Sequence, residues 1–428
     1  MALLGKSAAW KQWQRNVRIS PARPLAFFSQ QRINNQTMAL DLQRARQETP
    51  GVEHVLHFNN AGSALPPQTV LDATIAHLQL EARIGGYEAA EQANDAIEHT
   101  YDAIAQLLSC ARSEIALLES ATRAWDMAFY SIQFKPGDRI LTAMAEYASN
   151  YIAYLQIAQK TGVIIEAIPS DEHGQTSVEA LRQMIDERVK LIAITHVPTS
   201  GGLVNPAAEI GKIAREYGIL YLLDACQSVG QMPVNVETIG CDLLSATGRK
   251  YLRGPRGTGF LYVRSSVLDR LEPPVLDLHS AEWTAPDRYE MRPDARRFES
   301  WESSPATRIG LGVAIDYALQ WEMDKTWRRV RDLAYALRTG LSPIPGTIVH
   351  DRGITQCGIV TFTVEGKDPA EIKRVLASQQ INVTVAERSS TLLDLSARNL
   401  TSMVRASVHY YNSEAEIARF LQAIEALA

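Results

Sequence analysis

The chain has 428 residues, of which 46% are hydrophobic and 21% charged, and its formal net charge at pH 7 is −5. These values are ordinary for a globular protein and give no reason to expect nucleic acid as a partner. No apolar run approaches the roughly 18 residues needed to span a bilayer, so we expect no membrane segment either.

Residues 1–37 differ from the rest of the chain because they are basic and contain no acid. The cations are Lys6, Lys11, Arg15, Arg18, Arg23 and Arg32, and the first acid is Asp41. This composition is typical of an organellar transit peptide. The alternative is an unstructured extension ahead of a true start at Met38, so the segment is left out of the fold prediction.

The cysteines are scattered along the chain and form no C-x-x-C pair; they are Cys110, Cys226, Cys241 and Cys357. This pattern favours a reducing compartment over a disulfide framework or a zinc site, and we expect no metal. A cytoplasmic location is the simplest expectation, and a mitochondrial one applies if residues 1–37 are a transit peptide.

A long amphipathic helix is predicted over residues 89–108, and a regular alternation of strands and helices follows it. Short apolar strands are predicted over 114–120, 138–143, 163–169, 189–197, 219–225, 241–247 and 257–264. Helical patterns lie at 122–134, 149–162, 177–187 and 206–218; Gly162 and Gly218 mark helix ends and Pro206 a helix start. The alternation predicts an α/β fold with a mainly parallel sheet covered on both faces, the last strand being antiparallel.

The pattern changes after about residue 310. One long helix is predicted over 310–341, followed by strand, helix, strand, strand and helix up to residue 427. We therefore expect three parts: the basic extension at 1–37, an N-terminal segment with the large domain at 38–310, and a small α+β domain at 311–428.

Two ionisable residues stand where predicted strands end, and open α/β sheets bind ligands at that edge. Asp224 lies at the end of the strand 219–225, and a buried carboxylate there needs a cationic partner such as a protonated pyridine nitrogen. Its alternative role is to cap the next turn. Gln227, three residues later, can hydrogen-bond a ring oxygen. Lys250 follows the strand 241–247, where a solvated surface lysine is the ordinary alternative.

Hydroxyl groups at other strand ends indicate an anion site. The chain turns from strand to helix at Ser120–Thr122, and free N–H groups at a helix start bind anions together with hydroxyls. Thr247 and Arg249 repeat that chemistry just before Lys250 and can hold a phosphate. Tyr147 follows another strand and either stacks on a flat ring or packs in the core.

Taken in this order, the residues resemble the class V aminotransferase group of fold-type-I pyridoxal-5′-phosphate (PLP) enzymes. The motifs that carry the resemblance are HFNNAGSALPP at 57–67, LDACQSVG followed by SATGRKYLRGPRGTGFLYV at 223–263, and VRASVHYYNSEAEI at 404–417. The resemblance implies a seven-stranded, mainly parallel sheet flanked by helices, PLP as cofactor, an amino-acid substrate and a homodimer with shared active sites.

The resemblance also implies roles for the residues that contact PLP. Lys250 would form the Schiff base with the cofactor, Asp224 would face the pyridine nitrogen, and Gln227 would lie on the side of the ring hydroxyl. The implied phosphate ligands are Ala121, Thr122, Thr247 and Arg249. Tyr147 and Thr199 stand where cysteine desulfurases have a stacking histidine and often an asparagine.

Two further assignments follow from the resemblance. Arg405 matches the arginine that binds the substrate α-carboxylate, for which a planar guanidinium is well suited. The alternative is that Arg405 pairs with a surface acid such as Glu414 or Glu416. Ser303 or Ser304 would contact the phosphate of the neighbouring subunit.

One difference between this sequence and the cysteine desulfurases limits the possible reactions. Residues 385–400 correspond to their mobile sulfur-relay loop and contain no cysteine, which disfavours persulfide relay. Residues 70–91 and 390–412 resemble a branch that includes the hercynylcysteine sulfoxide lyases, which predicts carbon–sulfur β-elimination with Lys250 as the base. Transamination and epimerisation use the same residues and stay open; a catalytically inactive binding module of the same fold is a distant alternative.

Overall fold

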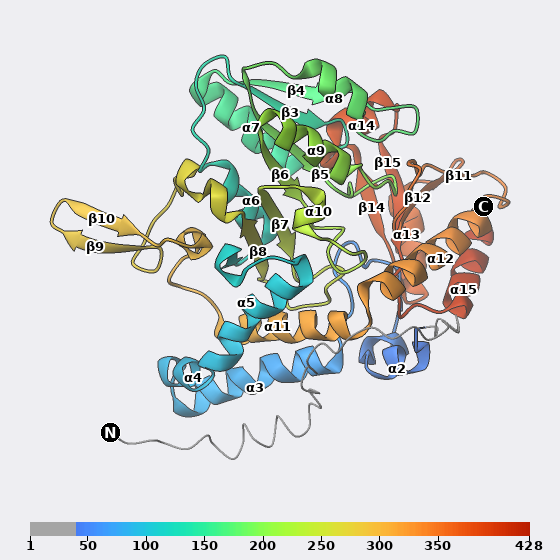
Figure 1. The fold of residues 1–428 in the computed structure, drawn as a ribbon. Coiled ribbons are helices and arrows are strands. Elements are labelled where there is room, and N and C mark those ends of the chain that lie inside the picture. Colours follow the sequence, from blue (N-terminus) through green and yellow to red (C-terminus); the bar gives the residue numbers. More distant parts are fainter. Residues whose placement is uncertain (1–39) are drawn as a thin grey trace, which may run out of the picture. The chain divides into compact units, whose positions relative to one another are not determined.

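The computed structural model describes residues 40–428, so the extension predicted at 1–37 lies outside the described residues. A seven-stranded sheet runs through the described part (Figure 1). Its spatial order is β2 (Ile115–Leu118), β8 (Gly259–Val263), β7 (Leu243–Thr247), β6 (Leu220–Asp224), β5 (Val189–Thr195), β3 (Arg139–Ala143) and β4 (Ile164–Ile168). β8 is antiparallel to both neighbours, whereas the other pairs are parallel. The predicted α/β sheet and its antiparallel strand are confirmed.

Helices cover both faces of this sheet. The first face carries α5 (Asn94–Leu108), α8 (Val178–Met184), α9 (Ala207–Tyr217), α10 (Val236–Ile239) and α11 (Pro305–Gln320), and the second carries α6 (Ala121–Phe129) and α7 (Ala148–Thr161). Alternate residues of β6 enter the two cores: Tyr221 and Leu223 the first, Leu220 and Leu222 the second. Burial on both sides explains why these strands are almost wholly apolar in sequence.

The predicted helix ends and the predicted helix start are confirmed. α7 ends at Gly162 and α9 at Gly218, whose φ angles of 79° and 65° lie in the left-handed region that favours glycine. α9 begins directly after Pro206.

A smaller antiparallel sheet lies toward the C-terminus, in the order β11 (Thr347–Val349), β12 (Ile359–Val364), β15 (Ser402–Ser407) and β14 (Thr384–Glu387). Its core includes side chains of α12 (Met323–Leu341), α13 (Pro369–Ser378) and α15 (Glu414–Glu425). Leu56 and Phe58 join the same core, and β1 (Leu56–His57) pairs with β13 (Ile381–Asn382). The N-terminal part of the described chain therefore packs against its C-terminal part.

Two predicted long helices are each broken in two. The helix predicted over 89–108 is α4 (Gly86–Gln92) followed by α5, with the break at Ala93 just before Asn94 and Asp95, residue types that favour helix starts. The helix predicted over 310–341 is α11 followed by α12. Glu322 between them has φ 56°, and the break lets α11 pack mainly into the core of the large sheet while α12 packs mainly into that of the small sheet. The domain boundary at 310 stays a prediction.

The remaining elements lie outside the two sheets, although some contribute side chains to their cores. They are α2 (Leu42–Gln47), α3 (Gln68–Ile84), the hairpin of β9 (Ala281–Ala285) with β10 (Arg288–Met291), α14 (Leu392–Ala397), and short 3-10 turns at Pro50–Glu53, Arg112–Glu114, Ser265–Arg270, Ala295–Phe298 and Arg388–Ser390. Between residues 40 and 428, no helix has both the length and the apolar character for a membrane crossing.

Candidate active site

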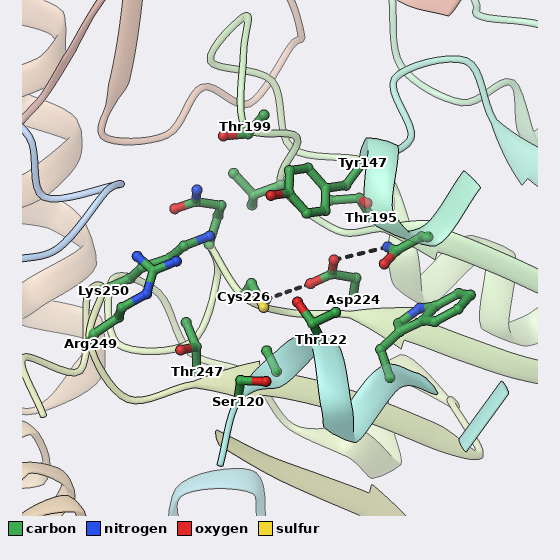
Figure 2. Close-up of a pocket in the computed structure, with 15 residues that line it drawn as sticks. Ser120, Thr122, Tyr147, Thr195, Thr199, Asp224, Cys226, Thr247, Arg249 and Lys250 are labelled. Carbon is green, nitrogen blue, oxygen red and sulfur yellow. Dashed lines mark hydrogen bonds between the residues drawn. The ribbon is translucent and has the colours of Figure 1, made fainter. Parts of the chain in front are cut away.

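A pocket opens at the carboxyl ends of the central strands, and Figure 2 shows the side chains that converge there. The residues that line it are Ser120, Ala121, Thr122, Trp125, Tyr147, Asn150, Thr195, Val197, Thr199, Asp224, Cys226, Gln227, Thr247, Arg249 and Lys250. Segments that are far apart in sequence thus bring together every predicted cofactor contact. This edge is where an open α/β sheet is expected to bind ligands.

Lys250 follows β7 and points into the pocket rather than into solvent (Figure 2). It is only partly accessible, so the alternative of a solvated surface lysine is wrong. Burial lowers the pKa of Lys250, and the negative charge of Asp224 partly offsets that effect. A lowered pKa increases the fraction of neutral amine, the form that is nucleophilic and can accept a proton.

Asp224 ends β6 and is 5% exposed. Its Oδ1 accepts a hydrogen bond of 2.9 Å from the Cys226 N–H, which is the turn cap expected under the alternative reading. Its Oδ2 accepts a hydrogen bond of 3.0 Å from Asn150 Nδ2. Within residues 40–428, Asp224 forms no ion pair within 4.0 Å. Capping therefore accounts for one oxygen and leaves a buried charge without a direct cationic partner.

The opposite side of the pocket is suited to an anion. Ser120 caps α6 by accepting the Arg123 N–H at 3.1 Å, and the first amides of a helix have no acceptor inside the helix. The hydroxyl groups of Thr122 and Thr247 and the guanidinium of Arg249 lie around the same space (Figure 2). Hydroxyls, a helix start and a cation together suit an anion such as a phosphate.

Arg405 lies beside the pocket, on β15 of the small sheet. Its Nη1 donates to Thr199, and the side chain is 8% exposed. The alternative pairing with Glu414 or Glu416 is wrong. Those acids pair instead with Arg329 and Arg46, respectively.

Five pocket residues were not predicted from the sequence as members of the site: Trp125, Asn150, Thr195, Val197 and Cys226. Asn150 donates to Asp224, while Thr195 and Trp125 line the same space. Behind them, Glu146 is 3% exposed and accepts a hydrogen bond from Asn150. The available signal was the stretch MAEYASN, where polar residues four positions apart flank Tyr147 at the start of a helix.

The family model described as aminotransferase class-V matches residues 56–420. The chain belongs to the class V aminotransferase family. It is a PLP-dependent enzyme, a lyase or a transferase, as the sequence predicts.

Several relatives of this class V enzyme are named cysteine desulfurases. A probable cysteine desulfurase of Xylella fastidiosa is 30% identical over 396 residues, which cover 90% of this chain and 95% of the relative. One from Pyrococcus abyssi is 28% identical, covering 89% and 96%. The apo structure of a cysteine desulfurase from Thermococcus onnurineus superimposes with a TM-score of 0.84 at 27% identity, covering 91% and 98%. A desulfurase structure from Escherichia coli, at 21% identity and TM-score 0.84, supports the fold.

The pocket residues fit PLP chemically. Asp224 is a buried carboxylate without an ion-pair partner among the described residues, which suits a pyridinium nitrogen. Gln227 donates to the Ala61 carbonyl at 3.1 Å, whereas its buried Oε1 has no partner in the described chain and can accept a hydroxyl hydrogen. Lys250 and the anion-binding hydroxyls border the same pocket.

Proposed function

We propose that this class V enzyme is a carbon–sulfur lyase that removes a sulfur leaving group from the β-carbon of a cysteine-derived amino acid. The observation that carries the proposal is one pocket that holds the amine of Lys250 and the carboxylate of Asp224, with the cation of Arg405 beside it. Relatives of 28–30% identity named for the desulfuration of cysteine support chemistry at a carbon–sulfur bond.

The proposed roles assign PLP to this pocket. PLP, when bound, supplies an electron sink for bonds broken next to an amino nitrogen. Lys250 would hold the cofactor covalently, and Asp224 would accept a hydrogen bond from its ring nitrogen. Gln227 would meet the ring hydroxyl, and Tyr147 would contact the ring face.

The ends of the cofactor and the substrate are assigned to separate groups. Ala121, Thr122, Thr247 and Arg249 would hold the phosphate, and the cation of Arg405 would bind the substrate carboxylate.

Lys250 would also move the proton in the reaction. Its neutral amine, which burial favours, would take the proton from the substrate α-carbon. The electron pair left at the α-carbon would form a double bond to the β-carbon as the carbon–sulfur bond breaks. The sulfur group leaves with the electrons of that bond, and the remaining enamine is hydrolysed to pyruvate and ammonia.

Persulfide relay through a mobile cysteine is not part of the proposal. Residues 385–400 contain no cysteine, and part of this stretch is the helix α14. Cys357 is fully buried, and burial raises the pKa of its thiol to about 12. A thiol in that state is a poor nucleophile. Sulfur would therefore leave with the small-molecule product.

The finer proposal is a substrate similar to that of the hercynylcysteine sulfoxide lyases, resting on residues 70–91 and 390–412. Transamination and epimerisation are the alternatives within the family. The test is incubation of PLP-loaded protein with S-substituted cysteines, their sulfoxides and common amino acids, followed by mass spectrometry. Pyruvate with ammonia supports the lyase. Pyridoxamine phosphate, or inverted chirality without pyruvate, contradicts it in favour of an aminotransferase or an epimerase.

A homodimer is also proposed, on the basis of the family. Ser304 caps α11, and both Ser303 and Ser304 line a second cavity together with Arg308. A serine pair beside an arginine suits the proposed contact with the phosphate bound by the neighbouring subunit. Sedimentation of the PLP-loaded protein tests the dimer, and a monomer at micromolar concentration contradicts it.

A further inference from the structure

A buried glutamate lies behind the carboxylate of the pocket. Glu146 stands just before α7 and is 3% exposed. Its Oε1 accepts three hydrogen bonds: from Thr195 Oγ1 at 2.5 Å, from Asn150 Nδ2 at 2.8 Å and from the Tyr147 N–H at 2.9 Å. No lysine or arginine of residues 40–428 pairs with it within 4.0 Å. Glu146 therefore accepts hydrogen bonds and does not form a salt bridge with a described lysine or arginine.

Asn150 connects this glutamate to the pocket. Its Nδ2 donates to Glu146 Oε1 at 2.8 Å and to Asp224 Oδ2 at 3.0 Å, so both hydrogens of one nitrogen reach carboxylates. Rotating the amide by half a turn would point its oxygen at the carboxylate of Asp224, which offers no donor, and would remove the donor to Glu146 Oε1. The two carboxylates together allow only one orientation of the amide.

The two oxygens of Asp224 are held differently. Oδ1 is fixed by the backbone N–H of Cys226, whereas Oδ2 has only the Asn150 amide as a hydrogen-bond partner in residues 40–428. The backbone of Asp224 is held in the sheet, because Asp224 and Thr195 are register partners on neighbouring strands. The direction of Oδ2 therefore depends on a side chain that Glu146 orients.

We propose that Glu146 is a positioning residue, which orients the Asn150 amide so that Asp224 is held ready for the ring nitrogen of the cofactor. This inference rests on the proposed function, because it concerns the same carboxylate. Burial, followed by the charge of Asp224, raises the pKa of Glu146 to about 7. The position thus requires an acceptor at Oε1 more than a permanent charge, and glutamine can supply that acceptor.

The experiment measures binding rather than turnover. Apoprotein is titrated with PLP and with 1-deazapyridoxal 5′-phosphate, which has a carbon in place of the ring nitrogen. The ratio of the two dissociation constants isolates the interaction between the nitrogen and Asp224. A charge-assisted hydrogen bond predicts a ratio of about ten to one hundred for the wild type. Asp224→Ala should bring the ratio close to one.

Variants of Glu146 and Asn150 separate a positioning role from a general loss of folding. Asn150→Ala and Glu146→Leu should each lower the ratio about fivefold or more, since Oδ2 loses its partner or the partner loses its orientation. Glu146→Gln should keep the ratio within about twofold of the wild type. Thr142→Val is the matched control. It removes the 3.0 Å hydrogen bond to the other oxygen, Glu146 Oε2, and should leave the ratio unchanged.

The outcomes separate this inference from the proposed function. If Asp224→Ala leaves the ratio at its wild-type value, the assignment of Asp224 fails and both proposals fall. If Asp224→Ala abolishes the preference for PLP over the deaza analogue but Asn150→Ala does not lower it, only the positioning role of Glu146 and Asn150 is overturned. A Glu146→Gln protein that loses as much as Asn150→Ala also overturns it, because charge rather than orientation would then matter. Asn150→Ala keeps the test decisive even if Glu146→Leu does not fold.

Discussion

The guanidinium of Arg405 is anchored on Thr199. Arg405 Nη1 donates to Thr199 Oγ1 at 2.5 Å and to the Thr199 carbonyl at 3.2 Å, across 206 residues of sequence. Arg405 belongs to β15 of the small sheet and Thr199 to the segment after β5 of the large sheet. Arg405 Nε is buried and has no partner in the described chain. One nitrogen therefore ties the two sheets together while other donors stay available for an anion.

Arg405→Lys should lower the kcat/KM for the amino-acid substrate about ten- to hundredfold, mainly through KM. A lysine ammonium can replace neither the planar pair of donors nor the contact with Thr199, and a charge-assisted hydrogen bond contributes about 1.5–3 kcal/mol. Steady-state kinetics of both proteins measure the effect, and the visible spectrum of the PLP-loaded variant should be unchanged.

The control for Arg405 is a substrate without the carboxylate. Decarboxylated amines should react poorly with the wild type and lose little more in Arg405→Lys. If acids and amines lose activity equally in the variant, the arginine does not bind the carboxylate.

Lys250→Ala should abolish both the visible absorption of the PLP-loaded protein and its turnover. The variant has no amine for the covalent link or for taking the α-proton, so neither function survives. Absorption spectra after dialysis against PLP provide the measurement. Lys160→Ala, at an exposed position on α7, is the matched control and should behave like the wild type. A wild-type protein that stays colourless in the presence of PLP would contradict the proposed function.

Asp224→Asn should fold and retain some PLP but lose two or more decades of kcat. Removing one member of a buried charge pair costs roughly 3–5 kcal/mol, and an amide does not hold the ring nitrogen in its protonated form. The measurement is kcat at saturating PLP, with circular dichroism as the check on folding. Near-normal turnover would show that the ring nitrogen lies elsewhere.

Arg253→Ala should lower the free energy of unfolding by about 3 kcal/mol, because buried acceptors lose their donor and a large side chain leaves a void. Arg253 is 1% exposed and donates to Tyr410 Oη at 2.6 Å and to the Leu65 carbonyl at 2.8 Å. Its guanidinium also lies 4.5 Å from the ring centre of Tyr411. Urea unfolding measures the change. Arg256→Ala, at an exposed position nearby, should change stability by less than about 0.5 kcal/mol.

The sequence predicted those parts of the site that depend on local chemistry. Asp224 ends one strongly apolar strand and Lys250 follows another, so their meeting at one sheet edge followed from periodicity and topology. Arg405 could be assigned only through the family resemblance, because its contact with Thr199 depends on how the small sheet packs.

There are physical reasons why the sequence did not predict the missed residues and the helix breaks. Glu146 and Asn150 gain their importance from burial against β5 and β6, and a polar pair at a helix start looks the same when it is solvated. The break at Glu322 between α11 and α12 leaves the apolar periodicity almost uninterrupted in sequence. It exists because α11 packs mainly into the core of the large sheet and α12 mainly into that of the small sheet.

The pH dependence of stability should differ between the apo wild type and Glu146→Gln. Burial and the charge of Asp224 raise the folded-state pKa of Glu146 to about 7 from an ordinary 4.5. Between these values the unfolded chain releases the proton while the folded protein retains it. The contribution of this group to stability is therefore lost as the pH rises through that window. Glutamine does not titrate, so the unfolding free energy of the variant relative to wild type should increase by about 1–3 kcal/mol from pH 4.5 to 7.5.

Urea unfolding of both apoproteins at intervals of half a pH unit measures this difference, and contributions from all other groups cancel to first order. Glu172→Gln is the matched control, because the Glu172 side chain is 87% exposed; its difference from wild type should not change with pH. If the Glu146→Gln and wild-type stability curves run parallel across the window, Glu146 is ionised throughout. Its four donors would then outweigh the burial and the neighbouring charge that favour the protonated form.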